Sequence, residues 1–210
     1  MATKKPTVSL QIPAPNFHQA VFRLIGDAPY VQAKFSEKAK AQIREKMLGG
    51  SQSKKGRARE PRDFDADYKN AMHISREGWN GIPASCFRQA CISACRLVGF
   101  KMTLAKLALF VEADGYDKDE GTPLIKIQGK PHKHEQHVRN ATGVVDLRVR
   151  PMWDKWHANL TVRWDADLFS ATDILNLLNR VGQQVGIGEG RPDSKQSSGQ
   201  GWGLFHVGEK

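Results

Sequence analysis

The chain has 210 residues and a formal net charge of +10, from 32 Lys and Arg against 22 Asp and Glu. A chain of this length can bury a full hydrophobic core, so we expect residues 1–210 to form one domain. It has no apolar run long enough for a transmembrane helix, and no apolar segment typical of a secretory signal follows Met1. One predicted helix carries all three cysteines of the chain within a span of ten residues, at Cys86, Cys91 and Cys95. This odd number argues against a disulfide framework, and we expect a cytoplasmic protein with no contact to a membrane.

The positive charge is concentrated in the N-terminal third. Residues 1–62 hold 13 Lys and Arg against 4 Asp and Glu, whereas the other 148 residues hold 19 against 18. Such a bias is typical of proteins that bind a polyanion. On charge alone, a solvated segment that only keeps the protein soluble explains the bias as well as a polyanion partner does.

The periodicity of apolar residues predicts an α+β fold. Alternating apolar residues or spacings of three and four define the expected elements, which are strands at 17–25, 144–149, 158–164 and 204–207, helices at 83–98 and 174–185, and an apolar stretch at 104–111 that fits either type. We expect the strands at 144–149 and 158–164 to pair, and the polar, His-rich residues 129–143 to form a loop. The order of strong elements is that of the split βαβ, or ferredoxin-like, pattern, with two helices on one face of an antiparallel sheet and the other face open.

Residues 30–75 interrupt this order, and we interpret them as a basic insertion with little core of its own. Its centre is rich in glycine and serine, which predicts a flexible loop. The basic residues of this loop are expected to wrap a sugar-phosphate backbone and release counterions; they are Lys54, Lys55, Arg57, Arg59 and Arg62.

The start of the helix at 83–98 is a candidate anion site. Ser85 and the free amides of a first helical turn together suit a phosphate, and Arg88 lies one turn further on. Simple capping of the helix, by Pro83 with Asn80 or Ser85, explains the same residues equally well.

A glycine-rich run near the C-terminus is the second candidate site. Glycine permits positive φ and a close approach of a ligand to main-chain amides. We expect phosphates to be held there by Gly186, Gly188, Arg191, Lys195, Gly199, Gly201, Trp202 and Gly203. A flexible linker is the alternative interpretation.

The two motifs together resemble the RAMP (repeat-associated mysterious protein) superfamily. Residues 82–90, Ile-Pro-Ala-Ser-Cys-Phe-Arg-Gln-Ala, are similar to the Ile-Pro-Gly-Ser-Ser-Leu-Lys-Gly-Ala helix start of its members, although Ala84 and Gln89 replace glycines. The run Gly-Ile-Gly…Gly-Gln-Gly-Trp-Gly-Leu-Phe is similar to their C-terminal glycine-rich loop. The resemblance implies an RRM-like core, like that of the backbone subunits of CRISPR effector complexes. It also implies single-stranded RNA held along a filament of subunits, with the insertion as a thumb-like loop.

We therefore expect a protein that binds single-stranded RNA, or single-stranded DNA, without catalysis or cofactor, as a homo-oligomer or beside CRISPR-type subunits. One alternative is a metal-dependent endoribonuclease that uses Asp63, Asp65 or Asp67. Another is a phage structural protein, or a mimic of a CRISPR subunit, that acts through protein contacts. The histidines at 132–137 are interpreted as part of a polar loop and not as metal ligands.

Overall fold

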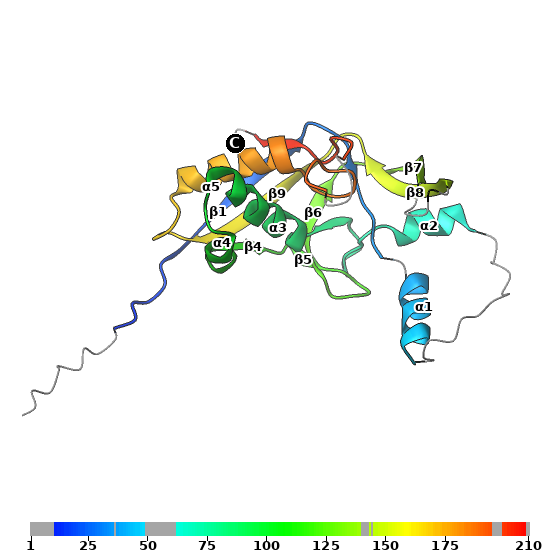
Figure 1. Ribbon diagram of the computed structural model, residues 1–210, viewed down its shortest axis with the longest axis horizontal. Helices are drawn as coiled ribbons and strands as arrows, with labels where there is room; N and C mark the ends of the chain where they lie inside the picture. Colours follow the sequence, from blue (N-terminus) through cyan, green and yellow to red (C-terminus); the bar gives the residue numbers. More distant parts are fainter. Residues whose placement is uncertain are drawn as a thin grey trace, which may run out of the picture.

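The computed structural model is an α+β molecule, and it describes residues 11–35, 37–48, 62–139, 143, 145–194 and 199–208 (Figure 1). Its elements in chain order are β1 (Phe17–Gly26), β2 (Tyr30–Val31), α1 (Glu37–Leu48), α2 (Phe64–Asn70), β3 (Gly81–Pro83), α3 (Ala84–Ala94), α4 (Met102–Ala108), β4 (Leu109–Glu112), β5 (Gly115–Tyr116), β6 (Pro123–Gln128), β7 (His132–Arg139), β8 (Val145–Trp153), β9 (His157–Asp165), α5 (Ala171–Arg180) and β10 (Phe205–Val207). A 3₁₀ turn, η1 (Cys95–Val98), follows α3, and a π-helical turn, η2 (Val181–Val185), follows α5. Within the described residues, no helix has the length and apolar character needed to cross a bilayer.

The main sheet is antiparallel and has the strand order β10-β1-β9-β6-β3. β4 also pairs with β9, and β5 pairs with β6. Phe22 lies opposite Leu160 in the β1–β9 register, and Leu24 lies opposite Ala158, so the apolar residues of both strands share one face. Side chains alternate between the faces of a sheet, which places Gln19 and its odd-numbered neighbours on the other side. That side is open, because Val21 there is 52% exposed.

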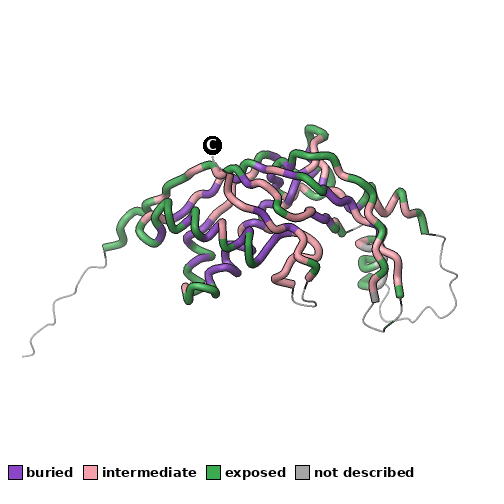
Figure 2. The backbone as a smooth tube through the Cα atoms, turned by 90° about the horizontal axis from the view of Figure 1, so that it is seen from above, coloured by how far each residue is buried: buried purple, intermediate pink, exposed green. Residues whose placement is uncertain are grey.

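Helices α3 and α5 lie together on the apolar face of this sheet (Figure 1). Phe87, Cys91 and Cys95 are buried in the core as the helical spacing predicted, and Figure 2 shows the buried backbone concentrated there. Burial raises the pKa of Cys91 to about 12, so its thiol stays protonated. Gly99 ends the 3₁₀ turn with a φ of 68°, a left-handed conformation that glycine adopts without strain.

A second, three-stranded sheet has the order β2-β8-β7 and corrects two expectations. Residues 132–139 form strand β7, so the prediction of a loop over 129–143 is wrong. The strands predicted at 144–149 and 158–164 exist as β8 and β9, but they belong to different sheets and do not form a hairpin. Alternation identifies a strand's buried face but not its partner, which packing elsewhere in the chain decides.

The segment 30–75 is joined to the core at both ends. Tyr30, Val31 and Gln32 are buried at its start, and Ala71 and Ser75 are buried at its end. Its middle part is peripheral: α1 lies away from the main sheet, and α2 packs against β8 (Figure 1). The segment therefore contributes to the core more than its polar composition suggested.

The apolar stretch at 104–111, which fitted either a helix or a strand, contains both. It forms the second part of α4, and the chain then extends directly into β4.

Candidate nucleic-acid interface

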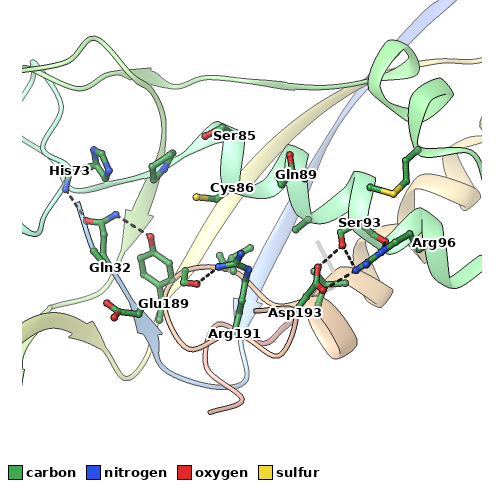
Figure 3. A pocket seen from close by; sticks show the side chains of 18 residues that line it. Gln32, His73, Ser85, Cys86, Gln89, Ser93, Arg96, Glu189, Arg191 and Asp193 are labelled. Carbon is green, nitrogen blue, oxygen red and sulfur yellow. Dashed lines mark hydrogen bonds and ion pairs between the residues drawn. The ribbon is translucent and has the colours of Figure 1, made fainter. Parts of the chain in front are cut away.

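A cavity of about 900 Å³ lies between the start of α3 and the glycine-rich loop (Figure 3). Its volume falls within the range of ligand sites, which is about 300–1,000 Å³. Ser85 lines it from the first turn of α3, and Gly188 and Arg191 line it from the loop. The two sequence motifs are therefore brought together on one cavity.

The first turn of α3 is left without a side-chain cap. Its N-cap residue is Pro83, which has no side-chain hydrogen-bonding group, and no side chain of the described residues caps the helix. The prediction that Asn80 or Ser85 caps it is wrong, because Ser85 is the second residue inside the helix. Antiparallel pairing of β3 with β6 fixes the point at which the chain enters the helix. Pro83, Ser85 and Cys86 line the cavity at this end of α3, where the helix N-terminus carries a partial positive charge.

The described part of the glycine-rich loop is folded against the core and is not a flexible linker. The amide of Gly203 donates to the Pro29 carbonyl at 2.8 Å, and the amide of Glu189 donates to the Val31 carbonyl at 2.9 Å. A Cβ on Gly188 would lie 2.6 Å from the Tyr30 ring, so a larger residue there would clash. Glycine is needed at these positions for close packing.

Several glycines that were expected to hold phosphates have structural roles. The amide of Gly186 donates to the Val181 carbonyl and that of Gly203 to Pro29, so neither amide is free for a ligand. A Cβ on Gly199 would lie 2.2 Å from the Arg191 carbonyl oxygen. Gly201 has a φ of 75°, and nothing lies within 4 Å of where its Cβ would be.

Arg191 is the one cationic side chain on the cavity wall without a carboxylate partner among the described residues. Among the described residues, the Arg191 side chain makes one hydrogen bond, from Nη1 to the Gly188 carbonyl at 2.9 Å. A guanidinium has five N–H donors, so most of its donors remain for a ligand. The other charged groups are balanced: Arg96 pairs with Asp193 at 2.8 Å, and Glu189 pairs with Arg150 at 2.7 Å.

Other predicted residues lie away from the cavity. Arg88 points elsewhere, donating to the carbonyls of Leu109 and Lys106, with its guanidinium 5.1 Å from the Phe110 ring centroid. Trp202 does not line the cavity; its ring packs against His134, with the ring centroids 5.4 Å apart. The expectation that Arg88 and Trp202 share one phosphate site is therefore wrong. The sequence gives a residue's position along a helix or loop, but not the direction in which its side chain points.

The basic loop is described only at its C-terminal end. Lys54, Lys55, Arg57 and Arg59, as well as Lys195, lie outside the described residues. Arg62 is described, and its guanidinium pairs with Asp67 at 2.6 Å and with Asp146 at 2.9 Å.

The carboxylates proposed for a metal centre are bound to other protein groups. Asp63 caps α2 by accepting hydrogen bonds from the amides of Asp65 and Ala66. Asp65 pairs with Lys133 at 2.9 Å, and Asp67 pairs with Arg62. Within the part of the chain that the structure describes, no group of three or more His, Cys, Asp or Glu residues is placed to hold a metal ion.

A buried polar network at one end of the cavity was not anticipated from the sequence. Nδ1 of His73 lies 2.9 Å from Asp117, whose side chain is fully buried and also accepts a hydrogen bond from Lys34 at 2.9 Å. Gln32 accepts a hydrogen bond from the His73 amide at 2.8 Å and donates to the Tyr30 hydroxyl at 3.0 Å. Figure 3 shows His73 and Gln32 beside each other at the cavity wall. No local pattern signals this network, since its members come from three separate parts of the chain, residues 30–34, His73 and Asp117.

The network fixes the charge state of its members. Burial lowers the pKa of His73, although its bond to Asp117 opposes this, so the imidazole is neutral at neutral pH. Burial alone would raise the pKa of Asp117, but hydrogen bonds from Lys34 and His73 outweigh it and lower that pKa, so the carboxylate is ionised. An ionised Asp117 requires a proton on Nδ1 of His73, which leaves Nε2 as a hydrogen-bond acceptor.

The open face of the main sheet carries a smaller cluster. The guanidinium of Arg163 lies 4.8 Å from the ring centroid of Phe17 and 4.7 Å from that of Phe110. Arg163 also pairs with Glu112 at 2.7 Å. Because Arg163 is already paired with a carboxylate, we place the candidate site in the cavity and not on the open face of the sheet.

The sequence matches no protein-family model, and no curated protein is significantly similar to it.

Proposed function

We propose that the chain binds single-stranded nucleic acid, with RNA as the expected strand, in the cavity between α3 and the glycine-rich loop, without catalysis. The observation that carries this proposal is the Arg191 guanidinium, which has no carboxylate hydrogen-bonded to it among the described residues, on the same cavity wall as the first turn of α3 with no side-chain cap. Both groups attract an anion, and a guanidinium matches the geometry of a phosphate.

The topology supports an RRM-like, ferredoxin-like core for this function. Strands β10, β1, β9 and β4 lie side by side in that order, and α3 follows β1 while α5 follows β9. This is the order expected for the split βαβ pattern with both helices on one face. The segment 30–75 then leaves the core next to the cavity, since Tyr30 and His73, near its two ends, both line the cavity wall. We propose that its basic residues extend the binding surface along the strand.

The proposal extends to assembly. The resemblance to filament-forming RAMP subunits implies several copies on one strand, and the net charge of +10 suits a polyanionic partner. Light scattering of the protein mixed with a long oligouridine is expected to give the mass of several copies per strand. A mass of one copy per strand at saturating protein would overturn this part.

Binding is tested with fluorescein-labelled oligouridine and fluorescence anisotropy over a range of salt concentrations. Arg191→Gln is expected to weaken binding about tenfold and to lower the salt slope by about 0.7, as the loss of one phosphate contact predicts. Arg180→Gln is the matched control, because Arg180 is exposed on α5, does not line the cavity, and loses the same charge. It should bind like the wild type.

Three results would contradict the proposal. The first is no binding of the strand at low salt. The second is equal affinity for the single strand and for a duplex. The third is identical behaviour of the Arg191→Gln and Arg180→Gln variants.

A further inference from the structure

The cavity wall carries two side chains with polar groups that keep hydrogen-bonding capacity among the described residues. Nε2 of His73 has no partner among the described residues, and the His73 residue is 8% exposed. The Tyr30 hydroxyl accepts a hydrogen bond from Gln32, but its own proton has no acceptor among the described residues, and Tyr30 is 1% exposed. Both residues line the cavity, so a ligand that bonds to both groups would be favoured over one that bonds to neither.

One of the two groups can accept a hydrogen bond, and the other can donate one. Because Asp117 holds the proton on Nδ1 of His73, Nε2 can only accept a hydrogen bond. The Tyr30 hydroxyl already accepts one from Gln32, which leaves its proton to be donated. Burial raises the pKa of Tyr30 well above its ordinary value, so this donor stays protonated. A group that both donates and accepts therefore matches the pair.

The pair is also held in place. Gln32 joins its two members, since its amide NH₂ group donates to the Tyr30 hydroxyl and its carbonyl accepts from the His73 amide. The same NH₂ group donates to the Gly81 carbonyl at 2.7 Å, which anchors the network to β3 at the start of α3. The two free capacities thus lie near the turn that we propose binds phosphate.

We propose that Tyr30 and His73 recognise a ribose 2′-hydroxyl, which would donate to Nε2 of His73 and accept from the Tyr30 hydroxyl, and that this pair makes the cavity select RNA over DNA. The inference rests on the proposed function, because the strand's phosphates must first enter the cavity. A deoxyribose offers neither group a partner. A site built to bond a ligand hydroxyl rejects the analogue that lacks it more strongly than an apolar pocket does.

The test compares oligouridine, the matching deoxyuridine strand and a 2′-fluoro strand by anisotropy. The wild type should bind the ribose strand about tenfold more tightly than the deoxy strand, as two neutral hydrogen bonds predict. The 2′-fluoro sugar keeps the pucker of ribose but cannot donate, so its strand should bind nearly as weakly as the deoxy strand. A 2′-fluoro strand that binds like RNA would overturn the inference, because backbone shape would then explain the preference.

Two variants assign the effect to the pair. Tyr30→Phe removes only the hydroxyl, and it should weaken ribose binding about threefold while leaving deoxy binding unchanged. His73→Asn removes the acceptor and should act in the same direction. Tyr116→Phe is the control, because Tyr116 is half-exposed on β5 and does not line the cavity. If Tyr30→Phe keeps the full ribose preference, the inference fails.

Failure of the inference can be distinguished from failure of the proposed function. Equal affinity of the wild type for ribose and deoxyribose strands, with Arg191→Gln still weakened, overturns the role of Tyr30 and His73 alone. No binding of any strand overturns the proposed function itself.

Discussion

Nδ1 of His73 lies 2.9 Å from the carboxylate of Asp117, although the two residues are 44 positions apart in the chain. His73 belongs to the end of the 30–75 segment, and Asp117 follows β5. The contact therefore joins this segment to the main sheet and at the same time orients an imidazole on the cavity wall. One buried carboxylate thus connects the stability of the fold with the chemistry of the candidate site.

The burial of His73 makes stability depend on pH in a defined window. The folded pKa of His73 lies below its ordinary value of 6.5 because burial disfavours the charged imidazolium. The unfolded chain therefore takes up a proton more readily, and stability falls as the pH drops from about 6.5 towards the folded pKa. The folded pKa of Asp117 is also lowered, so its contribution persists until the pH falls below about 4.

The measurement is thermal unfolding by circular dichroism between about pH 7 and pH 5. The melting temperature of the wild type should decrease across this range, and that of His73→Asn should be lower at pH 7 but less dependent on pH. Parallel pH profiles for the two proteins would show that His73 does not titrate as described.

Packing of the glycine-rich loop gives a second prediction. Gly203→Ala should destabilise the fold by about 2 kcal/mol or more beyond Gly201→Ala, a difference within the usual range for steric core substitutions. The two glycines share similar φ values of 70° and 75°, but the new Cβ would lie 1.8 Å from the Ile187 carbonyl oxygen only at position 203. Backbone strain, about 1–2 kcal/mol, is common to both variants and cancels in the comparison.

Urea unfolding of the two glycine variants measures this difference. Equal midpoints would mean that the loop does not pack against Ile187 in solution. The same two variants also test the proposed site. Gly203→Ala should bind oligouridine more weakly than Gly201→Ala, because it loosens the glycine-rich loop.

A third prediction concerns the acidic residues that begin α2. RNA incubated with the protein and Mg²⁺ should remain full-length, because Asp65 and Asp67 are engaged by Lys133 and Arg62 and Asp63 caps the helix. Gel electrophoresis of a labelled strand provides the measurement, with the metal chelated in a parallel sample. Cleavage that requires Mg²⁺ and disappears in Asp65→Ala or Asp67→Ala would instead support the endoribonuclease alternative.

Comparison with the sequence-based expectations shows where local patterns succeed. The buried face of α3 follows from the spacing of Phe87, Cys91 and Cys95. α5 begins with a capping box in which Ser170 and Asp173 are three residues apart, and both of its hydrogen bonds are present. These features depend on residues within a few positions of one another, so the sequence alone contains the necessary information.

Strand partners and side-chain directions did not follow from local patterns. The alternation in β8 resembles that in β9, yet β8 pairs with β2 and β7 in the second sheet. Trp153 and Trp156 lie near the turn between β8 and β9, where the sequence leaves their burial open, and both are buried in the core. Arg88 lies one turn from Ser85 but faces β4 and α4 instead of the cavity. Each outcome depends on which distant segment packs alongside.

The sequence by itself determined the α+β class, the principal helices and the two motifs that border the cavity, because periodicity and turn residues act over short distances. Only the tertiary structure decided that these motifs face one another, that Arg191 lacks a carboxylate partner among the described residues, and that Tyr30, Gln32, His73 and Asp117 form one network. The physical reason is that a buried polar group is satisfied by whichever partner the packing of strands and helices brings within hydrogen-bond distance, and that packing is a property of the whole chain.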